Sequence, residues 1–73
     1  MRETLLAVHG VAGIHELRTR KTGDLVVVDV HLEVDYRLSV IEAHEISESA
    51  RYSVIERHRV ADVMTHVDPV GRG

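Results

Sequence analysis

The most regular pattern in the chain is an alternation of apolar and polar residues between positions 25 and 35. Successive side chains of a β-strand point to opposite faces of its sheet, so such alternation predicts a strand with one buried face and one polar face. The apolar set is Val26, Val28, Val30, Leu32 and Val34, and the polar set is Asp29, His31, Glu33 and Asp35. A strand from Leu25 to Asp35 therefore requires a sheet whose second face stays polar.

A second strand is predicted just before this one, over residues 14–21. The intervening Thr22-Gly23-Asp24 is a turn signal, so the two strands should form an antiparallel hairpin. The first strand contains one conflict. In a regular strand His15 and Leu17 would share a face, although Leu17 ought to be buried. A bulge, or a strand that begins after His15, would resolve this conflict.

Two helices are predicted on either side of the hairpin. Residues 2–9 read as a short helix that Gly10 ends. Ser39 and Glu42 have the spacing of a capping box, which predicts a helix from Ser39 to about Arg57. Its apolar stripe should pack on the sheet and consists of Val40, Ala43, Ile46 or Ser47, Ala50 and Val54.

The last predicted element is a strand from Val60 to Val67. Asp68-Pro69 should end it, because proline cannot donate a hydrogen bond to a continuing ladder. Val70 to Gly73 is then a frayed tail. The order α-β-β-α-β predicts the α+β class, as a two-layer sandwich with three strands and both helices on one face.

A chain of 73 residues forms a single domain, residues 1–73. A domain of this size buries only about 60% of its unfolded surface, so it often gains support from disulfides, metal or oligomerisation. The chain has no cysteine, which excludes disulfides. Metal binding and self-association remain.

Composition and missing motifs exclude several function classes. A net charge of −3 and only two aromatic residues argue against nucleic-acid binding. No apolar run approaches the roughly 20 residues of a membrane span, and no signal peptide opens the chain. No Gly-rich phosphate loop, Cys-x-x-Cys pair or His-Glu-x-x-His motif is present, and nothing marks a serine as a nucleophile. The sequence therefore does not predict an enzyme.

Six histidines are the unusual feature of the composition. His66 and Asp68 are two residues apart on a predicted strand, so both should point to the same side. His31 and Glu33 share the polar face of the preceding strand for the same reason. If the two strands join one sheet, imidazole and carboxylate groups gather on the face away from the helices, and such ligands suit zinc and similar cations. The alternative is that each histidine is only a solvated polar residue.

The other histidines carry weaker signals. His44 falls on the flank of the second helix, where its spacing indicates a surface or interface residue. His9 and His58 lie at predicted helix ends, where a positive side chain interacts favourably with the helix dipole.

Four segments, taken together, are similar to the cytoplasmic domain of bacterial cation diffusion facilitators. They cover most of the chain, in the family's order and spacing, and are Val11–Arg20 (VAGIHELRTR), Val30–Glu33 (VHLE), Leu38–His44 (LSVIEAH) and His66–Pro69 (HVDP). The resemblance implies the same α-β-β-α-β, metallochaperone-like fold. It also implies that the transmembrane helices of such a transporter are absent from this chain.

The resemblance further implies a regulatory metal site. In zinc-transporting members its ligands occupy the positions of His15, His31, His44, His66 and Asp68, and the aspartate can bridge two ions at the interface of a homodimer. Metal binding would draw two subunits together and favour transport of a divalent cation in exchange for protons. The implied metal is Zn²⁺, with Mn²⁺, Fe²⁺, Co²⁺, Ni²⁺ and Cd²⁺ open. The implied location is the cytoplasmic side of the inner membrane, and the magnetosome branch of the family stays open.

Three other functions compete with this one. The domain could be a purely structural dimerisation module whose histidines are incidental. A metal-dependent hydrolase would need a substrate pocket, for which 73 residues leave little room. A soluble metallochaperone of this fold would normally use cysteines, which this chain lacks.

Overall fold

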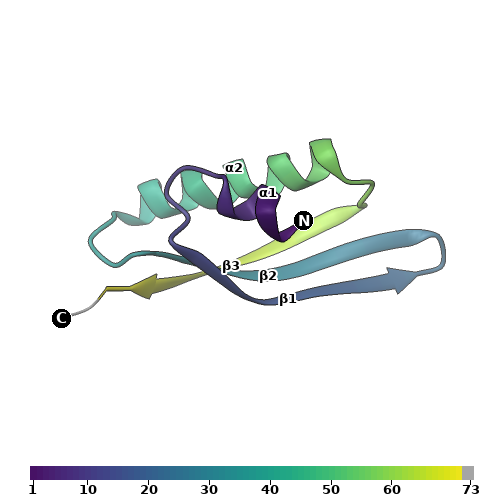
Figure 1. The fold of residues 1–73 in the computed structure, drawn as a ribbon, viewed down its shortest axis with the longest axis horizontal. Helices are drawn as coiled ribbons and strands as arrows, with labels where there is room; N and C mark the ends of the chain where they lie inside the picture. The colour runs from purple at the N-terminus through teal and green to yellow at the C-terminus, as the bar shows by residue number, and fades with distance from the viewer. Residues whose placement is uncertain (72–73) are drawn as a thin grey trace.

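The computed structural model describes residues 1–71 and has the predicted order of elements. Helix α1 (Arg2–Leu6) is followed by strands β1 (Gly13–Thr22) and β2 (Leu25–Asp35), helix α2 (Val40–Arg57) and strand β3 (Asp62–Val70). Both helices lie on one side of the sheet, as the α+β prediction required (Figure 1).

The three strands form one sheet in the order β1-β2-β3. β1 and β2 pair antiparallel across the tight turn, whereas β2 and β3 run parallel because α2 carries the chain back across the sheet. β2 is therefore the central strand, and its polar face is the middle of the open side of the sheet.

The core lies between the sheet and the helices. Val28, Val30 and Leu32 of β2 are fully buried, as the alternation predicted. Every other element adds to the same cluster, with Leu5, Ile14, Ala50, Val54 and Val63.

A β-bulge resolves the conflict between His15 and Leu17. The register of β1 against β2 shifts between His15 and Arg18, and the extra residue Glu16 has a φ of 51°. A bulge inserts one unpaired residue and so reverses the faces of the residues that follow it. His15 therefore stays on the open face opposite His31, while Leu17 packs against the core.

The predicted ends of α2 are correct, and the capping box explains the first of them. The backbone N–H of Glu42 donates to Ser39 Oγ at 3.0 Å, and the backbone N–H of Ser39 donates to Glu42 Oε1 at 2.8 Å. The predicted apolar stripe is wrong at its start. Val40 is 86% exposed, because the sheet-facing side of the helix begins further along, at Ser47, Ala50 and Val54.

Other predicted boundaries are also wrong. β3 begins at Asp62 rather than Val60. α1 ends at Leu6 rather than His9, with Ala7 as its C-cap. β3 runs to Val70 with Pro69 inside it, although proline was expected to end the strand. The reason is that β3 is an edge strand. The Val70 carbonyl accepts from the Tyr36 N–H on the β2 side, so the neighbouring Pro69 nitrogen faces the open edge, where no donor is needed. Arg72 and Gly73 of the predicted tail lie outside the described residues.

Candidate metal centre

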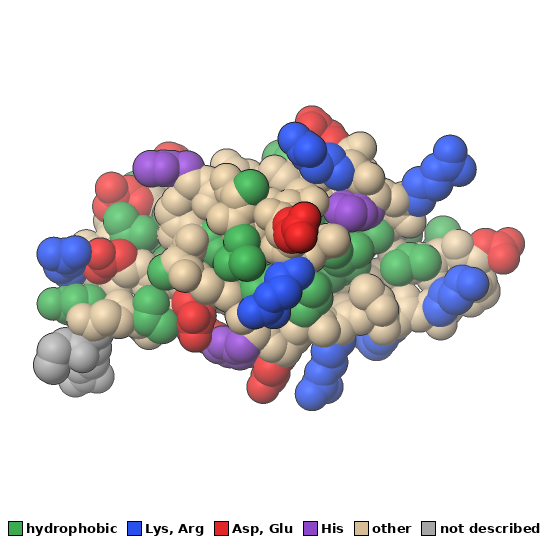
Figure 2. Space-filling model, viewed as in Figure 1, with side chains coloured by type: hydrophobic (Ala, Val, Ile, Leu, Met, Phe, Trp, Pro, Cys, Tyr) green, Lys and Arg blue, Asp and Glu red, His purple; other side chains and the backbone are tan. Residues whose placement is uncertain are grey.

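Three histidines, one from each strand, form a row across the open face of the sheet. His15 pairs in register with His31, and His31 pairs with His66. Their rings stack, with centroids 5.1 Å apart for His15 and His31 and 4.6 Å apart for His31 and His66. Histidine and acidic side chains occur together on the side of the molecule away from the helices (Figure 2).

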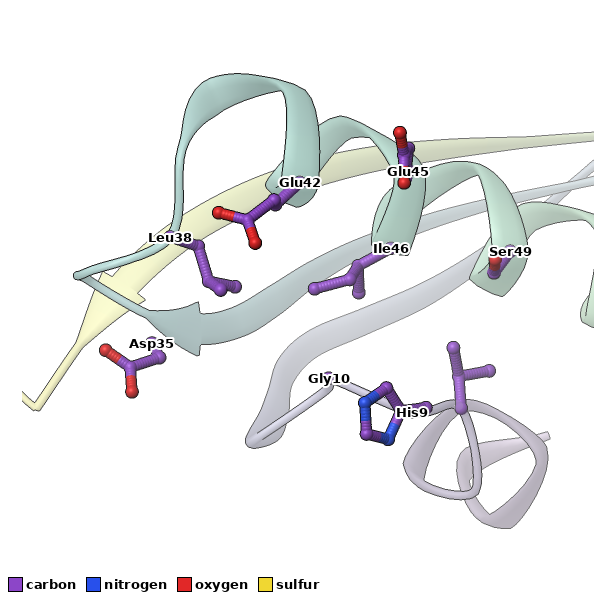
Figure 3. A pocket seen from close by; sticks show the side chains of 9 residues that line it. His9, Gly10, Asp35, Leu38, Glu42, Glu45, Ile46 and Ser49 are labelled. Atoms are coloured by element: carbon purple, nitrogen blue, oxygen red, sulfur yellow. The ribbon is translucent and has the colours of Figure 1, made fainter.

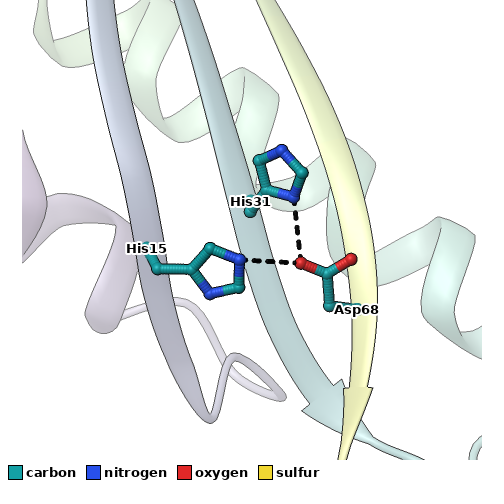
Figure 4. A group of neighbouring side chains, drawn as sticks. All are labelled: His15, His31 and Asp68. Carbon is teal, nitrogen blue, oxygen red and sulfur yellow. Dashed lines mark hydrogen bonds and ion pairs between the residues drawn. The ribbon is translucent and has the colours of Figure 1, made fainter.

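Asp68 joins two of these histidines. Its Oδ2 lies 2.9 Å from Nε2 of His15 and 2.9 Å from Nδ1 of His31 (Figure 4). One carboxylate oxygen thus meets two imidazole nitrogens that come from two other strands. Asp68 can reach them because it sits two residues beyond His66 on the same face of β3, as the strand period predicted.

This group has the composition of a divalent-cation site. Among residues 1–71, His15, His31 and Asp68 are the only three metal-ligating side chains whose ligand atoms all lie within 4.8 Å of one another. Two imidazoles and a carboxylate suit zinc and its first-row neighbours. The side chains of His31 and Asp68 are 30% and 37% exposed, so an ion can reach the group from solvent.

Two glutamates contact the outer nitrogens of the same rings. Oε2 of Glu33 lies 3.2 Å from Nδ1 of His15, and Oε2 of Glu16 lies 3.5 Å from Nε2 of His31. The sequence placed Glu33 on the polar face among the carboxylates that gather there, but not among the five predicted ligands. Nothing in the sequence indicated a role for Glu16, because its position depends on the bulge.

The other two predicted ligands lie apart from this group. His66 stacks on His31 but is outside the three-residue cluster. His44 is on α2, on the opposite side of the sheet, in a shallow groove beside Val40, Thr65 and Val67. Within one chain the fold therefore brings together three of the five predicted ligands.

The histidines that matched no ligand position also have clear surroundings. Nε2 of His58, the C-cap residue of α2, lies 3.1 Å from Thr4 Oγ1, so this histidine ties α1 to the end of α2. His9 lies beyond the end of α1, in a pocket on the helix side of the sheet (Figure 3). That pocket also holds Asp35, Glu42 and Glu45.

Two of those pocket carboxylates already have partners. The Arg37 guanidinium hydrogen-bonds Asp35 and lowers the pKa of this carboxyl to about 2. The backbone N–H of Ser39 hydrogen-bonds Glu42 and lowers its pKa as well. These contacts stabilise a turn and the start of α2. The pocket is therefore not a second cluster of metal-ligating side chains without partners.

The comparisons with known proteins decide the family. The family model described as "Cation efflux protein, cytoplasmic domain" matches residues 1–70, which is nearly the whole chain. The chain belongs to this family. The resemblance that the four motifs indicated is therefore confirmed, and the family is one of transporter domains rather than a known class of enzyme.

Relatives from plants and bacteria support the same assignment. The chain is 46% identical over 68 residues to metal tolerance protein 2 of Oryza sativa subsp. japonica, and 35% identical over 68 residues to the cation-efflux pump FieF of Pectobacterium carotovorum. These matches cover 92% and 93% of this chain but only 18% and 23% of the two relatives. The chain thus spans less than a quarter of either relative. No helix in residues 1–71 has the length and apolar character needed to span a bilayer.

Solved structures also share the fold. A MamM CTD variant is 30% identical to this chain with a TM-score of 0.89, and the match covers 94% of this chain and 86% of that one. Two further MamM CTD variants, each 28% identical with a TM-score of 0.89, were solved in a cadmium form and a nickel form. Their matches cover 94% of this chain in both cases, and 86% and 89% of theirs. The α-β-β-α-β prediction is confirmed.

Proposed function

We propose that this domain is a regulatory metal-binding module of a divalent-cation efflux transporter, and that His15, His31 and Asp68 hold the ion. The meeting of Asp68 Oδ2 with one nitrogen of each histidine, at 2.9 Å in both cases, is the observation that supports this proposal most strongly. The bound ion would replace the protons shared between Asp68 and the two imidazoles, and it would neutralise the charge of the carboxylate. The proposed metal is zinc or a similar cation, in keeping with a ligand set of two imidazoles and one carboxylate.

Three ligands leave a tetrahedral ion one position short. His66 is a candidate for this position, because its ring stacks on His31 with centroids 4.6 Å apart. A change of its side-chain rotamer would be needed to bring a nitrogen to the ion. His44 could join only from a second copy of the chain, because it lies across the sheet from the cluster.

A homodimer is part of the proposal. The name of the matching family model, ZT_dimer, denotes a dimerisation domain. The chain also carries large exposed apolar side chains at the start of α2, where Val40 is 86% exposed and Ile41 is 71% exposed. His44 lies on the same stretch of α2 as these residues. A second copy that covered this surface would bury the apolar groups and place His44 at the interface.

The regulatory role follows from this arrangement. A metal site that gains a ligand from a partner chain ties the association of two domains to the metal concentration. In a full-length transporter, such closure would favour the transporting state. The alternative is a purely structural dimerisation module, which the exposed apolar surface of α2 also fits.

Native mass measurement with and without zinc distinguishes these functions. The proposal predicts twice the monomer mass at micromolar concentration, with bound zinc that a chelator removes. A dimer that takes up no zinc would leave only the structural module, and a monomer under both conditions would remove the dimer from the account. The transport role is tested in vesicles that contain the full-length protein. There the pair H31A and D68A should lower the zinc-stimulated uptake rate without lowering the amount of inserted protein.

A further inference from the structure

Glu33 contacts His15 from the side opposite to Asp68. Its Oε2 lies 3.2 Å from Nδ1 of His15, while Nε2 of the same ring lies 2.9 Å from Asp68 Oδ2. The two nitrogens of one imidazole thus face two different carboxylates. Asp68 belongs to the three-residue cluster and Glu33 does not.

Gly13 makes room for this contact. It lies directly opposite Glu33 in the β1–β2 pairing, and a Cβ built on it would overlap Oε1 of Glu33. Gly13 is not among the glycines with a positive φ, so backbone conformation does not call for glycine here. The missing side chain instead provides the space in which the Glu33 carboxylate lies over β1 and reaches His15.

We propose that Glu33, seated over Gly13, is the positioning residue of the metal centre. An ionised carboxylate only accepts hydrogen bonds, so its contact keeps the proton of His15 on Nδ1. Once an ion displaces the proton that Nε2 shares with Asp68, the lone pair of Nε2 is therefore the one that binds the ion. The inference rests on the proposed metal function, because it assigns the tautomer and orientation of one of the proposed ligands.

A purely electrostatic role is the competing explanation. Glu33 would then strengthen metal binding only by its negative charge, whether or not it accepts a hydrogen bond from His15. Glu16 offers a comparison within the same site, because its carboxylate lies 3.5 Å from His31 Nε2, and its side chain is 57% exposed. Gln at position 33 keeps an acceptor oxygen and removes the charge, so it distinguishes positioning from charge.

Calorimetric zinc titration of five variants beside the parent domain tests the inference. E33A and G13A should each weaken binding about tenfold to a hundredfold, which is usual for the loss of an outer partner of a ligating histidine. E33Q should stay within about threefold of the parent. E16A should weaken binding less than E33A does, because the Glu16 contact is longer and its side chain is more exposed. The double variant G13A/E33A should bind no more weakly than E33A, because the carboxylate that the new methyl group displaces is already gone. Melting curves without metal should show that every variant folds.

A second readout reports the tautomer directly. In the domain loaded with ¹¹³Cd and labelled with ¹⁵N, the parent should show coupling of cadmium to Nε2 of His15 while Nδ1 keeps its proton. E33A should lose the protected Nδ1 proton signal. Neither observation depends on transport activity, and a simple loss of stability would not produce them.

Each result has one meaning. Parent-like zinc affinity in E33A and G13A overturns the positioning role and leaves the metal site standing. Equal losses of zinc affinity in E33A, E33Q and E16A show that these side chains strengthen binding by their negative charge alone. If G13A/E33A binds zinc more weakly than E33A, Gly13 does not act through Glu33. A parent domain that binds no zinc or cadmium overturns the proposed function and this inference together.

Discussion

The two faces of strand β2 differ in what they contribute to the molecule. On the helix side, Val28, Val30 and Leu32 are fully buried and belong to the core that all five elements share. On the open side, His31 stays 30% exposed and contacts carboxylates rather than apolar groups. Residues adjacent in sequence therefore serve separate purposes. Stability and metal binding should respond to different substitutions, even though these alternate along one strand.

The largest expected effect is on the buried face. L32A should lower the free energy of unfolding by about 2–5 kcal/mol, because it removes fully buried methyl groups and leaves a cavity. Urea denaturation in the presence of a chelator measures this. L25A is the matched control, since Leu25 lies in the same strand but is 57% exposed and should cost much less. Equal losses from L32A and L25A would contradict the assignment of the faces.

The open face should contribute stability only when metal is bound. Zinc at a hundredfold excess over its Kd should add about 2.7 kcal/mol to the free energy of unfolding, and a chelator should reverse the gain. L32A should gain the same free energy at the same ratio of zinc concentration to Kd, because its metal site is intact. Thermal melts with and without zinc measure both gains. An unchanged melting temperature of the parent would favour the structural module.

A smaller effect is expected at the start of α2, away from the metal site. S39A should cost about 1 kcal/mol, because it removes the cap of the Glu42 backbone N–H. Zinc affinity should not change. S49A is the control within the same helix and should be neutral or stabilise by a few tenths of a kcal/mol, since alanine is the better helix former. Weakened zinc binding in S39A would show that the two faces are coupled.

The smallest expected effect is on the stability of the domain at acid pH. Arg37 holds the pKa of Asp35 at about 2, below the ordinary 3.8. A lowered pKa in the folded state stabilises above the ordinary value, and the contribution is lost as the pH falls from about 4 toward 2. R37A should therefore lose stability less steeply than the parent in this window. The effect is small because both groups are exposed. Urea midpoints from pH 5 to pH 2, without metal, measure it, and identical slopes would contradict it.

The sequence predicted those parts of the fold that depend on local patterns. The alternation gave both ends of β2, and the capping box placed the start of α2 at Ser39. The conflict at His15 correctly indicated an irregularity in β1. The errors come from context that a local pattern does not contain. Pro69 fits inside β3 only because β3 is an edge strand, and Val40 is exposed because α2 contacts the sheet further along.

The candidate site was predictable to a similar extent. The strand period placed His31, His66 and Asp68 on one face, and the fold agrees. His15 joined this set through the family resemblance, and its place on the open face depends on the bulge. The contact between Glu33 and His15 depends on the space above Gly13, which the sequence pattern did not reveal. His44 as a ligand stays a prediction, because it requires a second chain.

The central claim is that His15, His31 and Asp68 bind a divalent cation. Calorimetric zinc titration at pH 7.5 of the parent, D68A, H31A and H9A tests it most directly. D68A and H31A should each weaken binding at least tenfold, about 1.4 kcal/mol, while circular dichroism shows an intact fold. H9A should bind as the parent does, because His9 lies in the pocket on the helix side of the sheet. Normal binding by D68A and H31A, or an equal loss from H9A, would contradict the claim.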